Sequence, residues 1–276
     1  MKSFLVQCIY QDGDRSEWPR FIVLGDRSSI LADRMIEYAE SISLGGWKPD
    51  PCAIETRPFD PGAWLDCQEN ELYPEEVFVA ISGPLEVEDE SLLERVVAKI
   101  GARCFIVVDA ETMIRPDWHS VVRLPPHRSW DAQWAWGIRV FLDVLLEAVA
   151  HRGVICTDPM DILTCLSGRL CQLAVFHAEG EGRAVTAVDK AVQSLSGRID
   201  LAGADTFVLS FHMGTDFRMK EIHQGLETLK EAVDRDKTTI MATHVFTDGA
   251  RFAISLITAT PLVDRKIQET DGRLPC

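Results

Sequence analysis

The sequence predicts an α/β protein in which two parts flank one long apolar helix. Three patterns support this prediction. Through residue 124, short apolar runs alternate with segments of helical periodicity, which is typical of a parallel sheet covered on both faces. Residues 130–150 are apolar almost all round, as in a helix that is covered on every side. Beyond residue 153, strands and helices follow in a different order, which indicates an α+β unit.

The first part is expected to alternate strands and helices. A β-like stretch lies within residues 1–10, a short strand at 21–25 follows, and residues 28–43 repeat apolar side chains at helical spacing. Pro125 and Pro126 end the last strand, because proline cannot continue a ladder. The other predicted elements here are strands at 77–81, 104–108 and 120–124 and a helix at 92–100.

The second part is expected to pack two helices on a small sheet. The predicted helices are residues 182–194 and 217–233, and the predicted strands are 170–176, 206–211, 239–245 and 251–258. Asp248-Gly249 between the last two strands predicts a hairpin. We therefore expect a first domain at 1–129, a central core helix at 130–152, a second domain at 153–260 and a flexible tail at 261–276.

Charge and composition argue against several classes of function. The chain has 43 acidic and 28 basic residues, a formal charge of −15, which opposes binding to nucleic acid. No apolar run approaches the roughly 18 residues of a membrane span, and no cleavage site follows the first residues, so we expect a cytoplasmic protein without membrane insertion.

The cysteines and histidines do not predict a metal site. The eight cysteines form no Cys-x-x-Cys pair and lie mostly in apolar surroundings, which favours reduced core thiols. His212, His223 and His244 fall on three different predicted elements and show no ligand spacing.

A loop with two carboxylates follows the long helix. Residues 156–161, which we call the aspartate loop, read Cys-Thr-Asp-Pro-Met-Asp. Asp158 precedes Pro159 and is suited to cap the next helix, while Asp161 falls in the first turn, where a carboxylate suits the helix dipole. Capping alone would account for both aspartates.

Four segments of the second part, in this order, resemble the second domain of FtsZ, the bacterial division member of the tubulin family. In that family the matching stretches read approximately GLxNVDFAD, EDRAxxAxxxAI, DLSGA and EEVDPDA. The segments here are residues 153–161, 182–192, 200–204 and 231–236. Residues 75–83 and 119–125 are also similar to family strands. The resemblance implies a tubulin/FtsZ-like fold, with a Rossmann-like N-terminal domain, a central helix and an α+β C-terminal domain.

The family binds GTP through a loop of the form GGGTGTG, and the matching residues 82–90 depart from it. Only Gly83 remains, Pro84 lacks a backbone donor, and four carboxylates follow between residues 86 and 90. The first loop, residues 25–29, keeps Gly25, Arg27 and Ser28 in place of a glycine run. Arg27 is open to two interpretations, an anion contact or a solvated cation.

The position that recognises guanine in the family falls near Ala135 and Trp136, which offer no matching hydrogen bonds. Together with the two altered loops, this predicts that the chain binds no GTP or other cofactor and has no intrinsic GTPase activity.

In FtsZ the equivalent of the aspartate loop enters the nucleotide site of the next subunit. Asp158 and Asp161 match the two aspartates that polarise the attacking water there, while Cys156 replaces the family's asparagine. Two interpretations therefore stay open: the aspartates cap a helix only, or they cap it and also enter a partner's site.

The resemblance implies a non-catalytic protein that works by association. Its partner would be an FtsZ-type GTPase filament, which it regulates, or further copies of itself. Two alternatives are a scaffold of another bacterial machine that reuses the fold, and a residual GTPase or nucleotide sensor that binds a phosphorylated ligand through residues 25–29.

Overall fold

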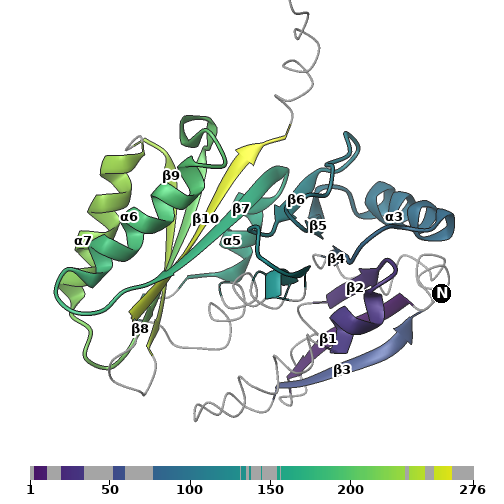
Figure 1. The fold of residues 1–276 in the computed structure, drawn as a ribbon, viewed down its shortest axis with the longest axis horizontal. Coiled ribbons are helices and arrows are strands. Elements are labelled where there is room, and N and C mark those ends of the chain that lie inside the picture. Colours follow the sequence, from purple (N-terminus) through teal and green to yellow (C-terminus); the bar gives the residue numbers. More distant parts are fainter. Residues whose placement is uncertain are drawn as a thin grey trace, which may run out of the picture.

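The described residues of the computed structural model form one mixed ten-stranded sheet with the order β3-β1-β2-β4-β5-β6-β7-β10-β8-β9 (Figure 1). The structure describes residues 3–10, 20–33, 52–59, 77–130, 132–134, 137, 144, 154–155, 157–233, 236–245 and 252–262. We call β1 to β6 the first half of the sheet and β7 to β10 the second half. β6 pairs in parallel with β7, so one sheet runs through both predicted domains.

The first half of the sheet has a parallel centre and an antiparallel edge. β2 (Arg20–Leu24), β4 (Val77–Ile81), β5 (Cys104–Val108) and β6 (Ser120–Arg123) are parallel, as the sequence predicts. β1 (Ser3–Tyr10) lies antiparallel between β2 and β3 (Cys52–Phe59). β3 was not predicted, because its sequence contains Pro58, a residue that strands tolerate mainly at an edge.

Two helical segments and a short turn are described in this half. Residues 28–33 are helical, while the rest of the predicted helix at 28–43 lies outside the described residues. α3 (Val87–Ile100) begins earlier than the predicted residue 92, and the 3₁₀ turn η1 (Gly101–Arg103) follows it. The early start agrees with the acidic first turn of α3, since carboxylates stabilise helix N-termini.

The second half packs two helices on one face of its strands. α6 (Arg183–Ser196) and α7 (Met219–Ala232) lie side by side over the sheet (Figure 1). The strands are β7 (Arg169–His177), β8 (Thr206–Met213), β9 (Thr238–Val245) and β10 (Phe252–Pro261). The short helix α5 (Pro159–Leu166) precedes β7, and the 3₁₀ turn η2 (Leu201–Gly203) precedes β8.

The predicted hairpin between the last two strands is wrong. β10 pairs antiparallel with β7 and β8, whereas β9 pairs in parallel with β8 at the sheet's edge. Burial explains the order: the first eight residues of β10 are buried and need neighbours on both sides, while β9 begins exposed. The Asp248-Gly249 turn itself lies outside the described residues.

One core cluster joins the two halves. Trp134 and Val144 are buried among side chains from β4, β5 and β6 and from β7, β8 and β10. The described residues between 130 and 144 are helical, so they place part of the predicted central helix in this shared core. A second cluster lies under α3 and a third under α6 and α7. Within the described part of the chain, no helix is long and apolar enough to cross a bilayer.

Candidate functional site

The loops that follow β2 and β4 meet at one edge of the sheet. Because these strands are parallel neighbours, their carboxyl ends lie side by side. Gly25 (φ +102°) and Gly83 (φ +121°) adopt backbone conformations that favour glycine. A Cβ at Gly25 would lie 3.2 Å from the carbonyl carbon of Ser82, and one at Gly83 would collide with the Asp26 carboxylate. We call residues 25–28 and 82–86 the phosphate-loop edge.

Ser82 ties the two loops together. Its backbone N–H and its hydroxyl both donate to the carbonyl oxygen of Leu24, at 2.8 and 2.7 Å. The hydroxyl is therefore turned back toward β2 and is engaged within the protein.

Asp89 fills the space behind these loops. It is the third residue of α3 and only 4% exposed, and its carboxylate is hydrogen-bonded to the backbone of Gly25 and Glu86. Burial raises the pKa of Asp89, and the charge of Glu86 adds to that increase, although the two backbone hydrogen bonds oppose it. Its Oδ2 atom is buried and has no hydrogen-bond partner in the described part of the chain. The carboxylate of Asp89 is thus a hydrogen-bond partner of the Gly25 backbone.

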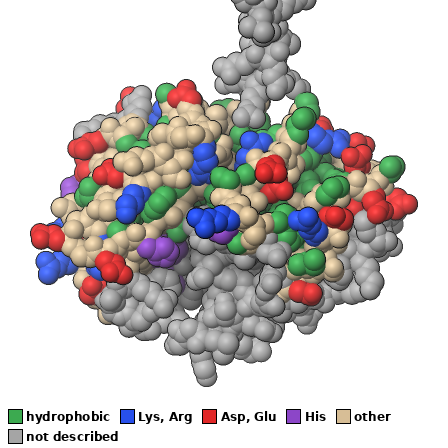
Figure 2. All heavy atoms as spheres, viewed as in Figure 1, with side chains coloured by type: hydrophobic (Ala, Val, Ile, Leu, Met, Phe, Trp, Pro, Cys, Tyr) green, Lys and Arg blue, Asp and Glu red, His purple; other side chains and the backbone are tan. Residues whose placement is uncertain are grey.

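Further acidic side chains surround Asp89. Glu86, Glu88 and Glu90 are exposed at the start of α3, and Figure 2 shows acidic side chains over the end of the molecule where α3 lies. The local potential at the phosphate-loop edge is therefore negative.

Arg27 is exposed and Ser28 is buried at the phosphate-loop edge. The guanidinium carbon of Arg27 lies 4.9 Å from the ring centroid of Trp130, a cation–π contact. Ser28 is 6% exposed, and its backbone N–H donates to the carbonyl oxygen of Gly25 at 3.1 Å. Arg27 thus packs on the start of the central helix.

The aspartate loop caps α5, as predicted. The side chain of Asp158 accepts a hydrogen bond from the backbone N–H of Met160 at 2.8 Å, and its carbonyl oxygen accepts from that of Asp161 at 3.0 Å. Asp158 and Asp161 are both exposed. Cys156 lies outside the described residues. Both aspartates are therefore accessible to a second molecule while one of them caps the helix.

Two threonines fix this segment against β9. Thr157 donates its hydroxyl proton to the carbonyl oxygen of Met241 at 2.6 Å, and the hydroxyl of Thr243 accepts from the N–H of Ile155 at 2.9 Å. In the strand order, β9 is seven positions from β2. The structure therefore does not bring Asp158 and Asp161 together with Gly25, Arg27, Ser28 and Gly83.

Apolar side chains are exposed beside both regions. Val154 and Met160, which flank Asp158, are 45% and 47% exposed. Ile30 and Val87, in the helices that begin at the phosphate-loop edge, are 47% and 83% exposed. The sequence analysis did not predict these exposed apolar side chains or the burial of Asp89. An apolar residue that does not fall on the buried face of its helix is the signal that could have revealed such exposed side chains.

Two cysteines of the sheet are buried thiols. Cys104 and Cys171 are buried, and burial raises the pKa of each to about 12. Among the residues that the structure describes, no group of three or more His, Cys, Asp or Glu could hold a metal ion.

Comparison with known proteins matches the second half of the chain to one family and about two thirds of the chain to solved structures. Residues 171–271 match the C-terminal domain of the FtsZ family. A single-substitution mutant of FtsZ from M. jannaschii is similar in structure, with a TM-score of 0.54 and 19% identity over 69% of this chain and 67% of that chain. An empty FtsZ dimer from M. jannaschii is similar with a TM-score of 0.53 and 18% identity, over 67% of this chain and 63% of that chain.

The chain thus spans about two thirds of the length of these FtsZ structures. No curated protein matches its sequence. At this level of identity the structural similarity establishes the fold, and the family match covers the second half. The chain has an FtsZ/tubulin-like fold, and residues 171–271 match the C-terminal domain of the FtsZ family.

Proposed function

We propose that this chain is a non-catalytic FtsZ-like protein that binds an FtsZ-type GTPase filament and offers it the aspartate loop. The observation that carries the proposal is the buried carboxylate of Asp89 on the backbone of Gly25. It places the chain's own negative charge where a nucleotide-binding member of this fold would place a phosphate.

Electrostatics at the phosphate-loop edge support the loss of nucleotide binding. A phosphate needs free backbone N–H donors and a positive potential, both usual at a helix N-terminus. Here Asp89 is bonded to Gly25, Asp26 lies against Gly83, and Pro84 has no N–H to donate. A triphosphate would have to displace these carboxylates and then bind beside them.

The aspartate loop supports association with a partner. Asp158 and Asp161 are exposed, and Val154 and Met160 supply exposed apolar surface beside them. One of the similar structures is an FtsZ dimer. A subunit with accessible aspartates but a filled phosphate-loop edge would engage a filament through one face, and so would cap or interrupt it.

Mixing the protein with the FtsZ of the same organism and GTP tests the proposal. Co-sedimentation measures binding, and phosphate release measures the GTPase rate. The informative variant replaces Asp158 and Asp161 by asparagine, because asparagine still caps a helix but carries no charge. We expect the wild type to co-sediment and to change the GTPase rate, and the double variant to co-sediment without changing it.

The outcomes distinguish association with the filament from a role of the two aspartates in helix capping alone. No co-sedimentation, with polymer mass and GTPase rate unchanged, would refute the association. A double variant that alters the rate as the wild type does would show that the two carboxylates only cap α5. Met160→Gln is a matched surface control: it removes exposed apolar area without touching the cap, so it should weaken co-sedimentation and leave the fold intact.

A further inference from the structure

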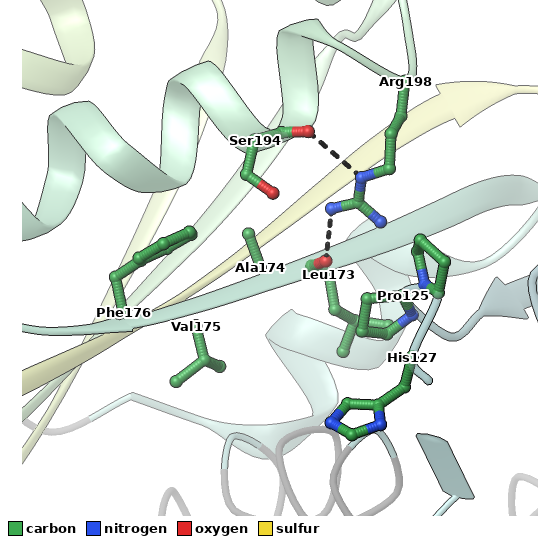
Figure 3. Close-up of a pocket in the computed structure, with 9 residues that line it drawn as sticks. Pro125, His127, Leu173, Ala174, Val175, Phe176, Ser194 and Arg198 are labelled. Carbon is green, nitrogen blue, oxygen red and sulfur yellow. Dashed lines mark hydrogen bonds between the residues drawn. The ribbon is translucent and has the colours of Figure 1, made fainter. Parts of the chain in front are cut away.

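A cavity of about 280 Å³ opens beside β7, in the second half of the sheet, and no residue of the aspartate loop or the phosphate-loop edge lines it. Its walls are residues 125–127, residues 173–176 of β7, Ser194 and Arg198 (Figure 3). The volume is near the lower end, roughly 300 Å³, of the range for ligand pockets. It therefore suits a short segment or one side chain with its neighbours.

The cavity exists because β6 stops before β7 does. The pairing of β6 with β7 ends at Arg123 and Gln172, whereas β7 continues to His177 against β10 on its other side. Pro125 and Pro126 cannot supply ladder N–H groups, and the side-chain amide of Gln133 holds the loop by donating to the Pro125 carbonyl at 3.1 Å. Among the described strands, none pairs with residues 173–176 on the β6 side.

Arg198 lies at this open edge. Its Nε donates to the carbonyl oxygen of Ser194 at 3.1 Å and its Nη2 to that of Leu173 at 2.8 Å, as Figure 3 shows. A guanidinium has five N–H donors, so three are left over, and no described carboxylate pairs with it. Burial lowers the pKa of Arg198.

Three other described arginines differ from Arg198 in having carboxylate partners. Arg115, Arg169 and Arg183 each pair with one or two carboxylates. Arg198 is partly buried between a strand edge and the proline loop, and its partners among the described residues are both carbonyl oxygens. A carboxylate from outside would complete its hydrogen bonding.

We propose that this cavity binds an extended segment of a partner protein that carries a carboxylate. The segment pairs as a short strand with the open edge of β7 at residues 173–176, its carboxylate pairs with Arg198, and an apolar neighbour packs on Val175 and the proline loop. Strand addition supplies main-chain affinity, and the arginine supplies specificity. The site is independent of the aspartate loop and of the proposed function.

Titration of the isotope-labelled full chain with three short peptides tests the proposal by NMR. The first is acetyl-Val-Glu-Val-Thr-amide, the second replaces Glu by Gln, and the third is the first with its central amides N-methylated. We expect saturable shifts at residues 173–176 with the first peptide, binding about tenfold weaker with the second because a charge-assisted bond is lost, and no saturation with the third.

The peptide controls act on the unaltered protein, so the test does not depend on a variant that folds. Equal binding of the Glu and Gln peptides, or the absence of saturable shifts with the first peptide, would overturn the proposal. Saturation by 4-methylpentanoate without peptide binding would overturn the strand pairing. In the R198Q protein, the two peptides should bind equally.

Discussion

In the second half of the sheet Arg183 pairs with two carboxylates, whereas in the first half Asp89 is buried and forms no ion pair with a described residue. Arg183 is 6% exposed and donates to Glu221 at 2.8 Å and to Asp216 at 3.0 Å, joining the start of α6 to the start of α7. Asp89 has the backbone of Gly25 and Glu86 as partners, and its Oδ2 atom has no hydrogen-bond partner among the residues that the structure describes.

The difference shows two uses of one residue type. The carboxylates of the second half form ion pairs with Arg183 that stabilise the fold. The family match also lies in this half. The carboxylate of the first half occupies a backbone position that a phosphate loop needs, at a cost in stability that its raised pKa reflects. Under the proposed function, the second half is a scaffold for contact with a partner, while the first half no longer binds a nucleotide.

The largest expected effect is the loss of the Arg183 network. R183M should lower the free energy of unfolding by about 3 kcal/mol, because Glu221 is then left partly buried without its cation. The matched control is R169M, whose pair with Asp205 is more exposed and should cost about 1 kcal/mol. Urea unfolding followed by tryptophan fluorescence measures both; equal losses would contradict the account.

The second effect tests the close approach of the two phosphate-loop edge glycines. G83A should cost about 2 kcal/mol, from the strained φ and from the collision with Asp26. G168A, at φ +74° with open space around it, isolates the φ contribution and should cost about 1 kcal/mol. In a double-mutant cycle, D26A should relieve part of the G83A loss. Strict additivity would show that Asp26 does not lie there.

Substitution of Asp89 should stabilise the protein, whereas the substitutions of Arg183 and Gly83 should destabilise it. Its folded-state pKa is raised above the unfolded value of 3.8, so its favourable contribution is present below pH 3.8 and is lost as pH rises through the folded pKa. D89N removes the charge and keeps an acceptor for Gly25, so it should stabilise the protein by about 1 kcal/mol at pH 7 and less at pH 3.5. Destabilisation at pH 7 would mean that the charged form is favoured.

The smallest expected effect is the acid dependence of the Arg183 network. Hydrogen bonds from Arg183 lower the pKa of Asp216; burial alone would raise that of Glu221, but Arg183 and the Arg218 backbone lower it overall. Because the pKa of each carboxylate is lower in the folded state, each contributes stability that is fully present above its unfolded pKa of 3.8 or 4.5. That stability is lost as the pH falls through the folded-state pKa. Stability should therefore fall less steeply in acid for R183M than for the wild type.

Sequence patterns predicted the parallel strands well and the edges poorly. Central parallel strands such as β4 and β5 are buried on both faces and read as continuous apolar runs. β3 has no such run, and the Asp248-Gly249 signal gave the wrong partner for β10, because strand order depends on packing between distant segments.

The candidate regions were predicted to different degrees. The Asp158 cap follows from local chemistry and was predicted. The burial of Asp89 was not, since it requires α3 to begin at Val87 and to bring its third residue against Gly25 from another strand. Likewise, Pro125-Pro126 predicted the end of β6, but the cavity beside Arg198 depends on β7 running further.

Calorimetric titration of the protein with GTP in the presence of Mg²⁺ tests the central claim, that its own carboxylates have replaced the nucleotide, most directly. We predict no saturable heat in the micromolar range for the wild type. Saturable binding of GTP at micromolar affinity would contradict the account of Asp89 and the phosphate-loop edge.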